Sequence, residues 1–590
     1  MLLVLALVIQ LLPMQVLGDE IRQDTQEETV ETPISGQEQN LVATEDFSLE
    51  DAELLAEDTS KRTQFTKEFT LSGGMTLAVV YPEAVHYEED GQWKDIDNTL
   101  QAVGRGATGT YRNRAGSWYA EFPQHLGKGS VVSITSGGYT VSFSMAGQLL
   151  ADQLMSEGSV ARAGTQEELT LAEVAQVAAQ VIELDYSEMK AAATHPETVP
   201  EKLKSRLSYE SVFANTDIVY DMTPHQLKES IVLKQYNAQV QGYRYILNTG
   251  GLIPVLNTDN SIDLMDPKTK ASVMQMPAPF MIDDAGEISY NVTVTLTQKG
   301  DDWILTYRMP MAWLADSQRA WPVILDPVVN ATSDYGNVID RALSENTTFA
   351  YNGGALAFGH SPKYGDARTF IRYASLPILS AADVVVYAEL SLWAYDGSTG
   401  ATLAEAHRIT TNWDSQTISW ADQPGIDNMV EDYANVTVGG RFHWNITDAA
   451  RSWYTDGNYG IAIKAPQSVE DSSTENWKKV YSIDYSKYAT SWWPYLAIAY
   501  RNTSGLEDYW DYTSLSAGRA GTAYVNNYSG NLTVVRGDIG FGGNLMPVSI
   551  SHIYNSHDAG TNEFGLGYGW RTNYHQRLIL DEDTNLGNSV

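Results

Sequence analysis

Residues 384–395 have the sequence VVVYAELSLWAY, and this stretch decides the fold class. One face of a strand built from it carries only apolar side chains: Val384, Val386, Ala388, Leu390, Leu392 and Ala394. The opposite face carries Tyr387, Glu389, Ser391, Trp393 and Tyr395. A period of two with one apolar face predicts a strand with a buried side and an amphipathic side, as in a β-sandwich.

The same period recurs on both sides of this strand. Residues 131–135 and 139–143 alternate around Ser136-Gly137-Gly138, which predicts a β-hairpin. Two prolines bracket a short apolar strand over 321–327 and predict a domain edge. We therefore expect a mainly β, multidomain protein. It has a β-rich N-terminal domain over 65–329, a β-sandwich over 330–500 and a third β segment over 501–590.

A helical insertion is expected inside the N-terminal domain, over about residues 150–206. Thr165 and Glu168 have the spacing of a capping box, which marks the start of a helix. Apolar residues then recur at helical spacing: Leu171, Val174, Ala175, Ala178, Val181 and Ile182. The pattern predicts an α-helix that continues to residue 182.

The start of the chain is typical of an export signal. Residues 1–12 form an apolar run that is too short to span a bilayer, and Pro13 ends it. Gly18 and Asp19 then flank the expected cleavage site, although no basic residue precedes the run, and a buried strand is the competing interpretation. Residues 19–64 are acidic and poor in aromatics, which predicts a disordered linker. We expect Sec export to the cell wall or medium, with no membrane contact after signal removal.

Composition excludes several classes of partner and chemistry. The 590 residues include 38 basic and 74 acidic side chains, for a formal net charge of −36. Such a charge repels nucleic acid and anionic membranes, so we expect neither as a partner. The chain has no cysteine, which excludes disulfides, thiolate nucleophiles and cysteine-ligated metals.

Motifs for catalysis or metal binding are missing from the sequence. It has no glycine-rich phosphate loop, no Gly-x-Ser-x-Gly elbow and no His-Glu-x-x-His helix, so we expect neither enzymatic activity nor a cofactor. Residues 581–587 have part of the oxygen spacing of a calcium loop, but the glycine is displaced by one position. A polar hairpin turn is the favoured interpretation there, and structural calcium is left open with no residues assigned to it.

The 330–500 unit resembles the DNRLRE domain of bacterial surface proteins. The matching residues are Arg368–Tyr373, Leu390–Leu392, Trp413, Thr417–Trp420, Pro424, Asp448, Trp453 and Pro494–Leu496. The resemblance implies a jelly-roll β-sandwich of the kind classed with carbohydrate-binding modules.

The segment after residue 500 resembles the lead-in of Rhs/YD-repeat wall-associated proteins. The residues that carry this resemblance are Tyr509–Tyr512, Ala520–Leu532, Met546-Pro547 and Gly565–Arg571, with Asp217–Tyr220 and Trp321–Val323 earlier in the chain. It implies a front region that precedes a repeat array, which forms a β-shell around a C-terminal toxin. The chain has no run of YD repeats, so we expect it to be truncated, with the downstream shell as its partner.

Two functions follow from these patterns. The first is a non-catalytic scaffold that presents an Rhs-type polymorphic toxin or adhesin at the cell surface. The second is a carbohydrate-binding module that holds cell-wall or extracellular polysaccharide on Tyr387, Trp393 and Tyr395, because sugar rings stack on flat aromatics. A neighbouring loop or domain that covers these rings is the alternative. A polysaccharide lyase is a third hypothesis, since fold does not fix function. Trp413 and Trp420 are interpreted as core residues.

Overall fold

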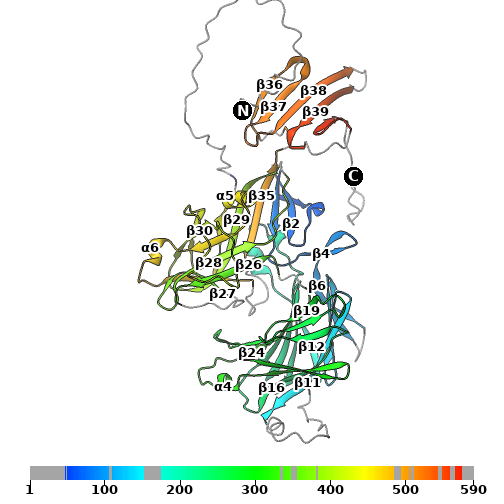
Figure 1. Ribbon diagram of the computed structural model, residues 1–590, viewed down its shortest axis with the longest axis vertical. Helices are drawn as coiled ribbons and strands as arrows, with labels where there is room; N and C mark the ends of the chain where they lie inside the picture. The colour runs from blue at the N-terminus through cyan, green and yellow to red at the C-terminus, as the bar shows by residue number, and fades with distance from the viewer. Residues whose placement is uncertain are drawn as a thin grey trace, which may run out of the picture. The chain divides into compact units, whose positions relative to one another are not determined.

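The computed structural model describes residues 47–574, with gaps at 48, 73, 105–108, 152–173, 333–335, 347–354, 381–382, 484–492, 504, 507–509, 542–547 and 559–564. The expected signal peptide with Gly18 and Asp19, the capping box at Thr165 and the 581–587 loop lie outside the described residues. The protein is mainly β, and its described strands are antiparallel (Figure 1).

The predicted sandwich is present and is built around the strand at 384–395. Its strands are β26 (Val338–Ser344), β27 (Ala355–Ser361), β28 (Gly365–Tyr373), β29 (Asp383–Gly397), β30 (Thr402–Arg408), β31 (Asp432–Val436), β32 (Gly440–Asn445), β33 (Ile461–Lys464), β34 (Asn476–Tyr481) and β35 (Tyr495–Asn502). Leu390 and Leu392 on β29 pack with Ile461 and Ile463 on β33 in one buried core. The short helices α5 (Thr447–Trp453) and α6 (Gln467–Glu470) complete it. From Ala388 to Ala394 the apolar face of β29 points into this core, as the alternation predicts. The prediction was wrong at the start of the strand, because a register shift between Val385 and Tyr387 turns Val385 into this core and Val386 into a second cluster.

Three strands from the start of the chain extend this sheet, which corrects the expected domain boundary. They are β1 (Leu54–Glu57), β2 (Thr66–Leu71) and β3 (Met75–Val80), followed in space by β35 and β29. Leu77 lies opposite Ala499, and Val79 lies opposite Ala497. The expected N-terminal domain over 65–329 was therefore wrong at its first strands, because the edge of β35 needs a partner and β3 supplies it.

The expected disordered linker over 19–64 was also wrong for its last part. Residues 54–57 form β1, and η1 (Thr59–Lys61) follows. Leu49 is only 2% exposed and joins Leu77 and Ala497 in a second buried cluster. The acidic side chains Glu50 and Asp51 stay exposed. A few apolar residues between exposed acids are enough to order the segment once β2 and β3 lie beneath them.

The remaining N-terminal residues form two further sheets around one core. The first contains β6 (Asp97–Val103), β7 (Thr110–Ala115), β8 (Tyr119–Pro123), β10 (Val132–Ser136), β11 (Tyr139–Leu150), β16 (Val240–Asn248), β22 (Thr293–Lys299) and β23 (Asp302–Arg308). The second contains β9 (His125–Leu126), β12 (Val177–Ile182), β13 (Ser205–Phe213), β14 (Thr216–Met222), β15 (Gln226–Leu233), β17 (Ile253–Leu256), β18 (Ile262–Met265), β19 (Ser272–Met276), β20 (Phe280–Ile282), β21 (Ile288–Ser289), β24 (Val323–Asp326) and β25 (Val328–Asn330). A separate hairpin joins β4 (His86–Glu89) to β5 (Gln92–Asp95).

Of two local predictions in this region, the hairpin is confirmed and the helix was wrong. The predicted hairpin is confirmed, because β10 pairs with β11 and both turn glycines, Gly137 and Gly138, have positive φ. The predicted helix through 182 was wrong, since β12 is a strand on which Val181 lies opposite Leu207. The run from 177 to 182 is short, and pairing with β13 overrides its helical spacing. The described helical turns of the insertion are α3 (Ser187–Ala192) and η3 (Pro196–Thr198).

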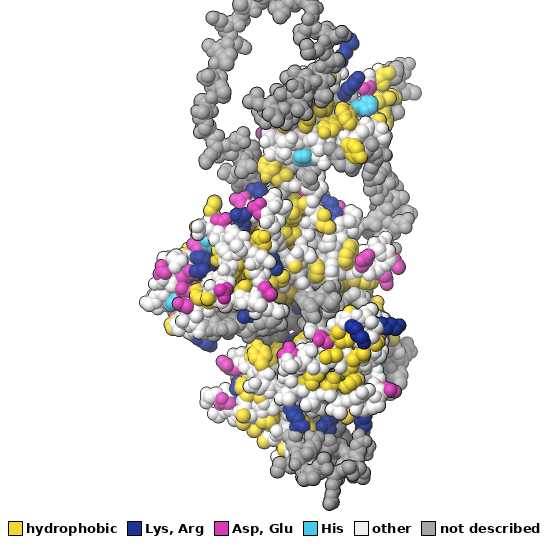
Figure 2. Space-filling model, in the orientation of Figure 1, with side chains coloured by type: hydrophobic (Ala, Val, Ile, Leu, Met, Phe, Trp, Pro, Cys, Tyr) yellow, Lys and Arg dark blue, Asp and Glu magenta, His cyan; other side chains and the backbone are white. Residues whose placement is uncertain are grey.

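The last described residues form a separate five-stranded sheet. Its strands are β36 (Tyr512–Ser516), β37 (Thr522–Asn526), β38 (Leu532–Phe541), β39 (Val548–Asn555) and β40 (Trp570–Thr572), in that order. Leu515, Ile539, Val548 and Ile550 are 43%, 47%, 41% and 38% exposed. Figure 2 shows hydrophobic side chains gathered over this sheet. These four large apolar side chains of the sheet are therefore in contact with solvent.

Candidate functional site

Tyr387, the first of the three predicted platform residues, is partly covered. Its ring meets that of Phe47 edge-on at 5.6 Å between centroids, and its hydroxyl donates to the Glu389 carboxylate at 2.9 Å. Burial, reinforced by Glu389, raises the pKa of Tyr387 well above its usual range. The sequence left open whether a neighbouring loop or domain covers these rings. At Tyr387, Phe47 is the residue that contacts the ring. Tyr387 is partly buried by this contact, and its stacking on a sugar stays a prediction.

Tyr395, at the other end of β29, belongs to a different arrangement. Its ring stacks on Tyr481 of β34, with 4.3 Å between centroids and 13° between planes. The pairing of β29 with β34 shifts register between Ala394 and Asp396, so Tyr395 sits at an irregularity of the strand. Trp393 is partly exposed and lies opposite Arg441 of β32. The structure thus pairs Tyr395 with a residue that the sequence did not single out.

Strand β34 extends this arrangement along the outward face of the sheet. Its alternate residues Trp477, Lys479 and Tyr481 are partly exposed, while Lys478 and Val480 between them are buried. Trp477 meets Tyr364 edge-on at 5.6 Å. We call Tyr364, Tyr395, Trp477, Lys479 and Tyr481 the aromatic strip.

Lys479 lies in the middle of the aromatic strip. Its ammonium is 5.4 Å from the Trp477 ring centroid and 5.7 Å from that of Tyr364. It also forms an ion pair with Asp396 at 3.1 Å. The Trp477 indole donates to Glu475 at 2.7 Å, which fixes the ring orientation. Period-two alternation over 476–481 was a signal that could have found three of these residues.

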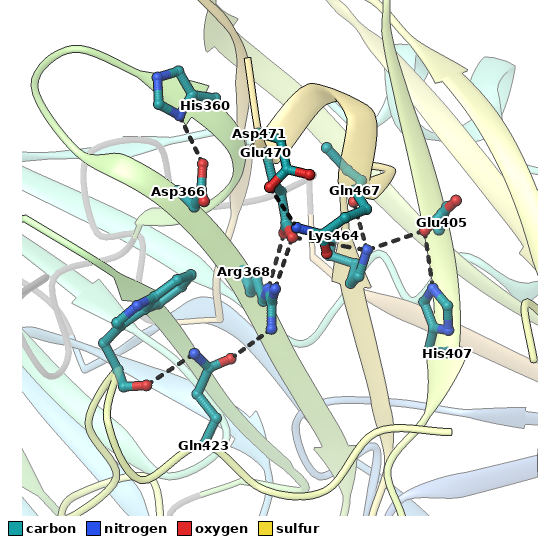
Figure 3. A network of polar contacts seen from close by, with 12 residues as sticks. His360, Asp366, Arg368, Glu405, His407, Gln423, Lys464, Gln467, Glu470 and Asp471 are labelled. Atoms are coloured by element: carbon teal, nitrogen blue, oxygen red, sulfur yellow. Dashed lines mark hydrogen bonds and ion pairs between the residues drawn. The ribbon is translucent and has the colours of Figure 1, made fainter. Parts of the chain in front are cut away.

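Strands β28, β30 and β33, which follow β34 and β27 in the same sheet, carry a network of charges, shown in Figure 3. Arg368 on β28 binds both carboxylate oxygens of Glu470, at 2.9 and 2.7 Å, and the Glu470 side chain has no exposed surface. Lys464 on β33 lies 3.1 Å from Glu405, which also contacts His407 at 3.1 Å. Burial alone would raise the pKa of Glu405, but hydrogen bonds from His407 and Lys464 hold it below its usual value.

This network is structural rather than a binding site. Two cations face two carboxylates, so their charges balance. Arg368 also contacts Gln423 at 3.1 Å and lies 5.2 Å from the Trp420 ring centroid, which ties the 409–427 loop to β28. Trp413 in that loop is 5% exposed and packs on Phe370. The interpretation of Trp413 and Trp420 as core residues is confirmed, because both belong to a buried cluster or pack against it.

In the part of the chain that the structure describes, no three His, Asp or Glu side chains gather as a metal ion would need. The described helices include none with the length and apolar character needed to cross a membrane.

Comparison with known proteins finds family models that match two segments of the chain. Residues 339–481 match the model of carbohydrate-binding module family 96, and residues 523–587 match a domain of unknown function, DUF6531. The solved structure of the heparinase III-BT4657 gene product covers 50% of this chain and 41% of its own at a TM-score of 0.18 and 9% identity, and this likeness supports no argument.

Two curated relatives extend the comparison beyond these two segments. The tRNA nuclease WapA of Bacillus subtilis is 25% identical over 85% of this chain, and the tRNA3(Ser)-specific nuclease WapA of Bacillus spizizenii is 25% identical over 86%. The chain spans only 20% and 21% of these relatives, so their named activity belongs to much longer proteins. Residues 339–481 thus match a carbohydrate-binding module, within a chain that is similar to part of the WapA proteins.

Proposed function

We propose that this chain is a non-catalytic extracellular region that binds polysaccharide through the aromatic strip. The observation that carries the proposal is the stacked pair Tyr395–Tyr481 beside Trp477 and Lys479, all inside the segment that matches a carbohydrate-binding module. The proposal includes export by the Sec route, cleavage between Gly18 and Asp19, and a cell-wall or extracellular location. It includes neither a nucleic-acid partner nor a cofactor.

The geometry suits a sugar chain for physical reasons. Axial C–H groups of a pyranose lie flat on aromatic rings, and strands hold those rings rigidly. Trp477 is partly exposed and meets the buried Tyr364 ring at 77°, so Tyr364 supports the Trp477 ring instead of contacting the ligand itself. The Lys479 ammonium, 19% exposed on its side chain, can donate hydrogen bonds to hydroxyl or carboxylate oxygens of the sugar. A rigid aromatic surface with one donor favours a polysaccharide over a small apolar ligand.

Replacing Tyr481 by Ala is expected to weaken polysaccharide binding by about 1–3 kcal/mol, or roughly 5- to 150-fold, by analogy with base stacking on aromatic rings. The change removes half of the Tyr395–Tyr481 stack while the buried face of β34 is unchanged. Isothermal titration with a panel of neutral and acidic polysaccharides measures the loss. Tyr433, which is 55% exposed on β31, is the matched control, and Tyr433→Ala should have no effect. Equal affinities for the two variants would contradict the proposal.

We also propose a presentation role for the segment after residue 500. One face of the sheet β36–β40 carries Leu515, Ile539, Val548 and Ile550, because Ile539 lies opposite Ile550 and Leu515 lies opposite Ala523. Monomeric proteins rarely leave contiguous apolar patches in water. We propose that this face docks against further β-structure such as a YD-repeat shell.

Hydrogen exchange tests this role on the 590-residue chain. We expect amides of β38 and β39 to exchange at least about 100-fold faster than those of β29, because a sheet with solvent on an apolar face opens locally at low cost. Ala388, Leu390, Leu392 and Ala394 of β29 lie in a buried core and are each at most 1% exposed. Equal protection of β39 and β29 would show that the C-terminal sheet is self-sufficient, and the docking role would lose its basis.

A further inference from the structure

A small cavity lies beside Ser391 of β29. It has a volume of about 40 Å³ and is lined by Ser391 on β29, Arg441 and His443 on β32, and Trp493 before β35, with Val199 and Pro200 across from them. The His443 side chain is 38% exposed, so the cavity is reached from solvent at that rim. This space is separate from the aromatic strip and is not used by the proposed binding mode.

The polar end of the cavity is formed by Arg441. Its guanidinium donates to the Ser391 hydroxyl at 3.1 Å and to the Trp493 carbonyl at 3.3 Å. Burial lowers the pKa of Arg441 to about 10, which still leaves the group charged at neutral pH. The Nδ1 atom of His443 lies 2.7 Å from the Glu389 carboxylate, which orients the ring. The cavity therefore offers fixed donors at one end.

The other walls are apolar and held in place. Trp493 is 8% exposed, and the Lys204 ammonium lies 3.6 Å from its ring centroid. The Tyr81 hydroxyl donates to the Thr198 carbonyl at 2.7 Å, which ties the segment around Val199 to the end of β3. Buried donors opposite rigid apolar walls are the usual composition of a small-molecule site.

The size and charge of the cavity select its ligand. A volume of 40 Å³ has room for a few water-sized groups and is too small for a hexose ring. The charged Arg441 guanidinium would attract an anion, whereas Glu389 next to His443 and the net charge of −36 on the chain oppose one, so a neutral polar group suits the cavity. An acetamido group is neutral and has the right size, with a methyl for the apolar wall and a carbonyl oxygen for the donors.

We propose that this cavity binds the N-acetyl group of an amino sugar in the polysaccharide, an inference that rests on the proposed polysaccharide-binding function. The methyl group lies against Trp493 and Val199, and the acetamido oxygen accepts hydrogen bonds from Arg441 or Ser391. Glycans with N-acetylated residues are then preferred over glycans with the same linkage and a hydroxyl at that position.

Titration of the 590-residue chain with chitohexaose and cellohexaose tests the inference. The two β-1,4-linked ligands are neutral and differ at C2, which bears an acetamido group in the first and a hydroxyl in the second. We expect chitohexaose to bind at least about tenfold more tightly, as one well-placed buried polar contact allows. Val199→Phe, which fills the cavity, should remove this preference and leave cellohexaose binding unchanged.

Controls separate the outcomes. Val438→Phe, at a turn residue that is 47% exposed and outside the cavity, should keep the preference, and Thr194→Phe at the cavity lining should remove it if Val199→Phe does not fold. Thermal unfolding establishes that each variant is folded. Equal affinity for the two hexaoses, or a preference that survives both filling variants, overturns the acetyl pocket while polysaccharide binding stands. Failure of the chain to bind any polysaccharide of the panel overturns the proposed function and this inference together.

Discussion

Replacing Glu229 by Gln is expected to remove about 3 kcal/mol of the pH dependence of unfolding between pH 4 and pH 8. Glu229 on β15 is 6% exposed, and the Tyr220 hydroxyl donates to its carboxylate at 2.5 Å. Burial raises the pKa of Glu229 from 4.5 to about 7. In the folded protein the group therefore stays protonated at pH values where the unfolded chain has already released the proton.

The direction follows from this raised pKa. Below pH 4.5 both states hold the proton and Glu229 costs nothing, whereas between pH 4.5 and 7 the free energy of unfolding falls as pH rises. Urea titration at both pH values measures the difference between the Gln variant and the original chain. Glu210→Gln, at an exposed position on β13, is the control and should change nothing. A Gln variant that loses stability equally at pH 4 and pH 8 would show that Glu229 does not titrate in this range.

Replacing Arg368 by Met is expected to destabilise the sandwich by about 3–5 kcal/mol. The change leaves the Glu470 carboxylate, with no exposed surface, without its bidentate partner. Lys464 lies 4.0 Å from Glu470 and is already bound to Glu405 at 3.1 Å, so it cannot take over both contacts. The cost is the penalty of an uncompensated buried charge.

A double-mutant cycle with Glu470→Met checks this explanation. Removing both partners leaves no buried carboxylate, so the double variant should recover most of the stability that Arg368→Met loses. Arg451→Met is the control, because Arg451 pairs with Asp448, whose side chain is 83% exposed, and the variant loses one further hydrogen bond, to the Val385 carbonyl. We expect this control to cost only about 1 kcal/mol. Additive losses in the cycle would indicate that packing of Arg368 on Trp420, rather than charge pairing, is what the first variant removes.

Local patterns predicted the parts of the fold that depend on neighbouring residues. The alternation in 384–395 and the turn glycines at 137–138 were sufficient for the core strand and the hairpin. Pairing between strands that are distant in the sequence has no such local pattern. Strand β3 pairs with β35 more than 400 residues later, with Leu77 opposite Ala499. No short-range sequence pattern predicts this pairing. Strand β12 shows the same effect, because its pairing with β13 replaced the predicted helix.

The part of the candidate site that lies within one strand was predictable, because it depends on neighbouring residues. The outward aromatics of β29 were visible in the sequence, but what covers them was not. Phe47, which covers Tyr387, lies in a segment whose acidity indicated disorder. Tyr481, which stacks on Tyr395, lies 86 residues further along the chain. A strand pattern shows which side chains share a face, whereas tertiary packing determines which of them remain accessible to solvent.

Radical footprinting of aromatic side chains, with and without bound polysaccharide, tests the central claim most directly. The 590-residue chain is saturated with whichever polysaccharide of the panel binds, and oxidation of each ring is followed by mass spectrometry. We expect protection of Tyr395, Trp477 and Tyr481, which surround Lys479, and unchanged oxidation of Tyr433 on β31. Protection of Tyr433 together with unaltered oxidation of Trp477 and Tyr481 would contradict binding through the aromatic strip.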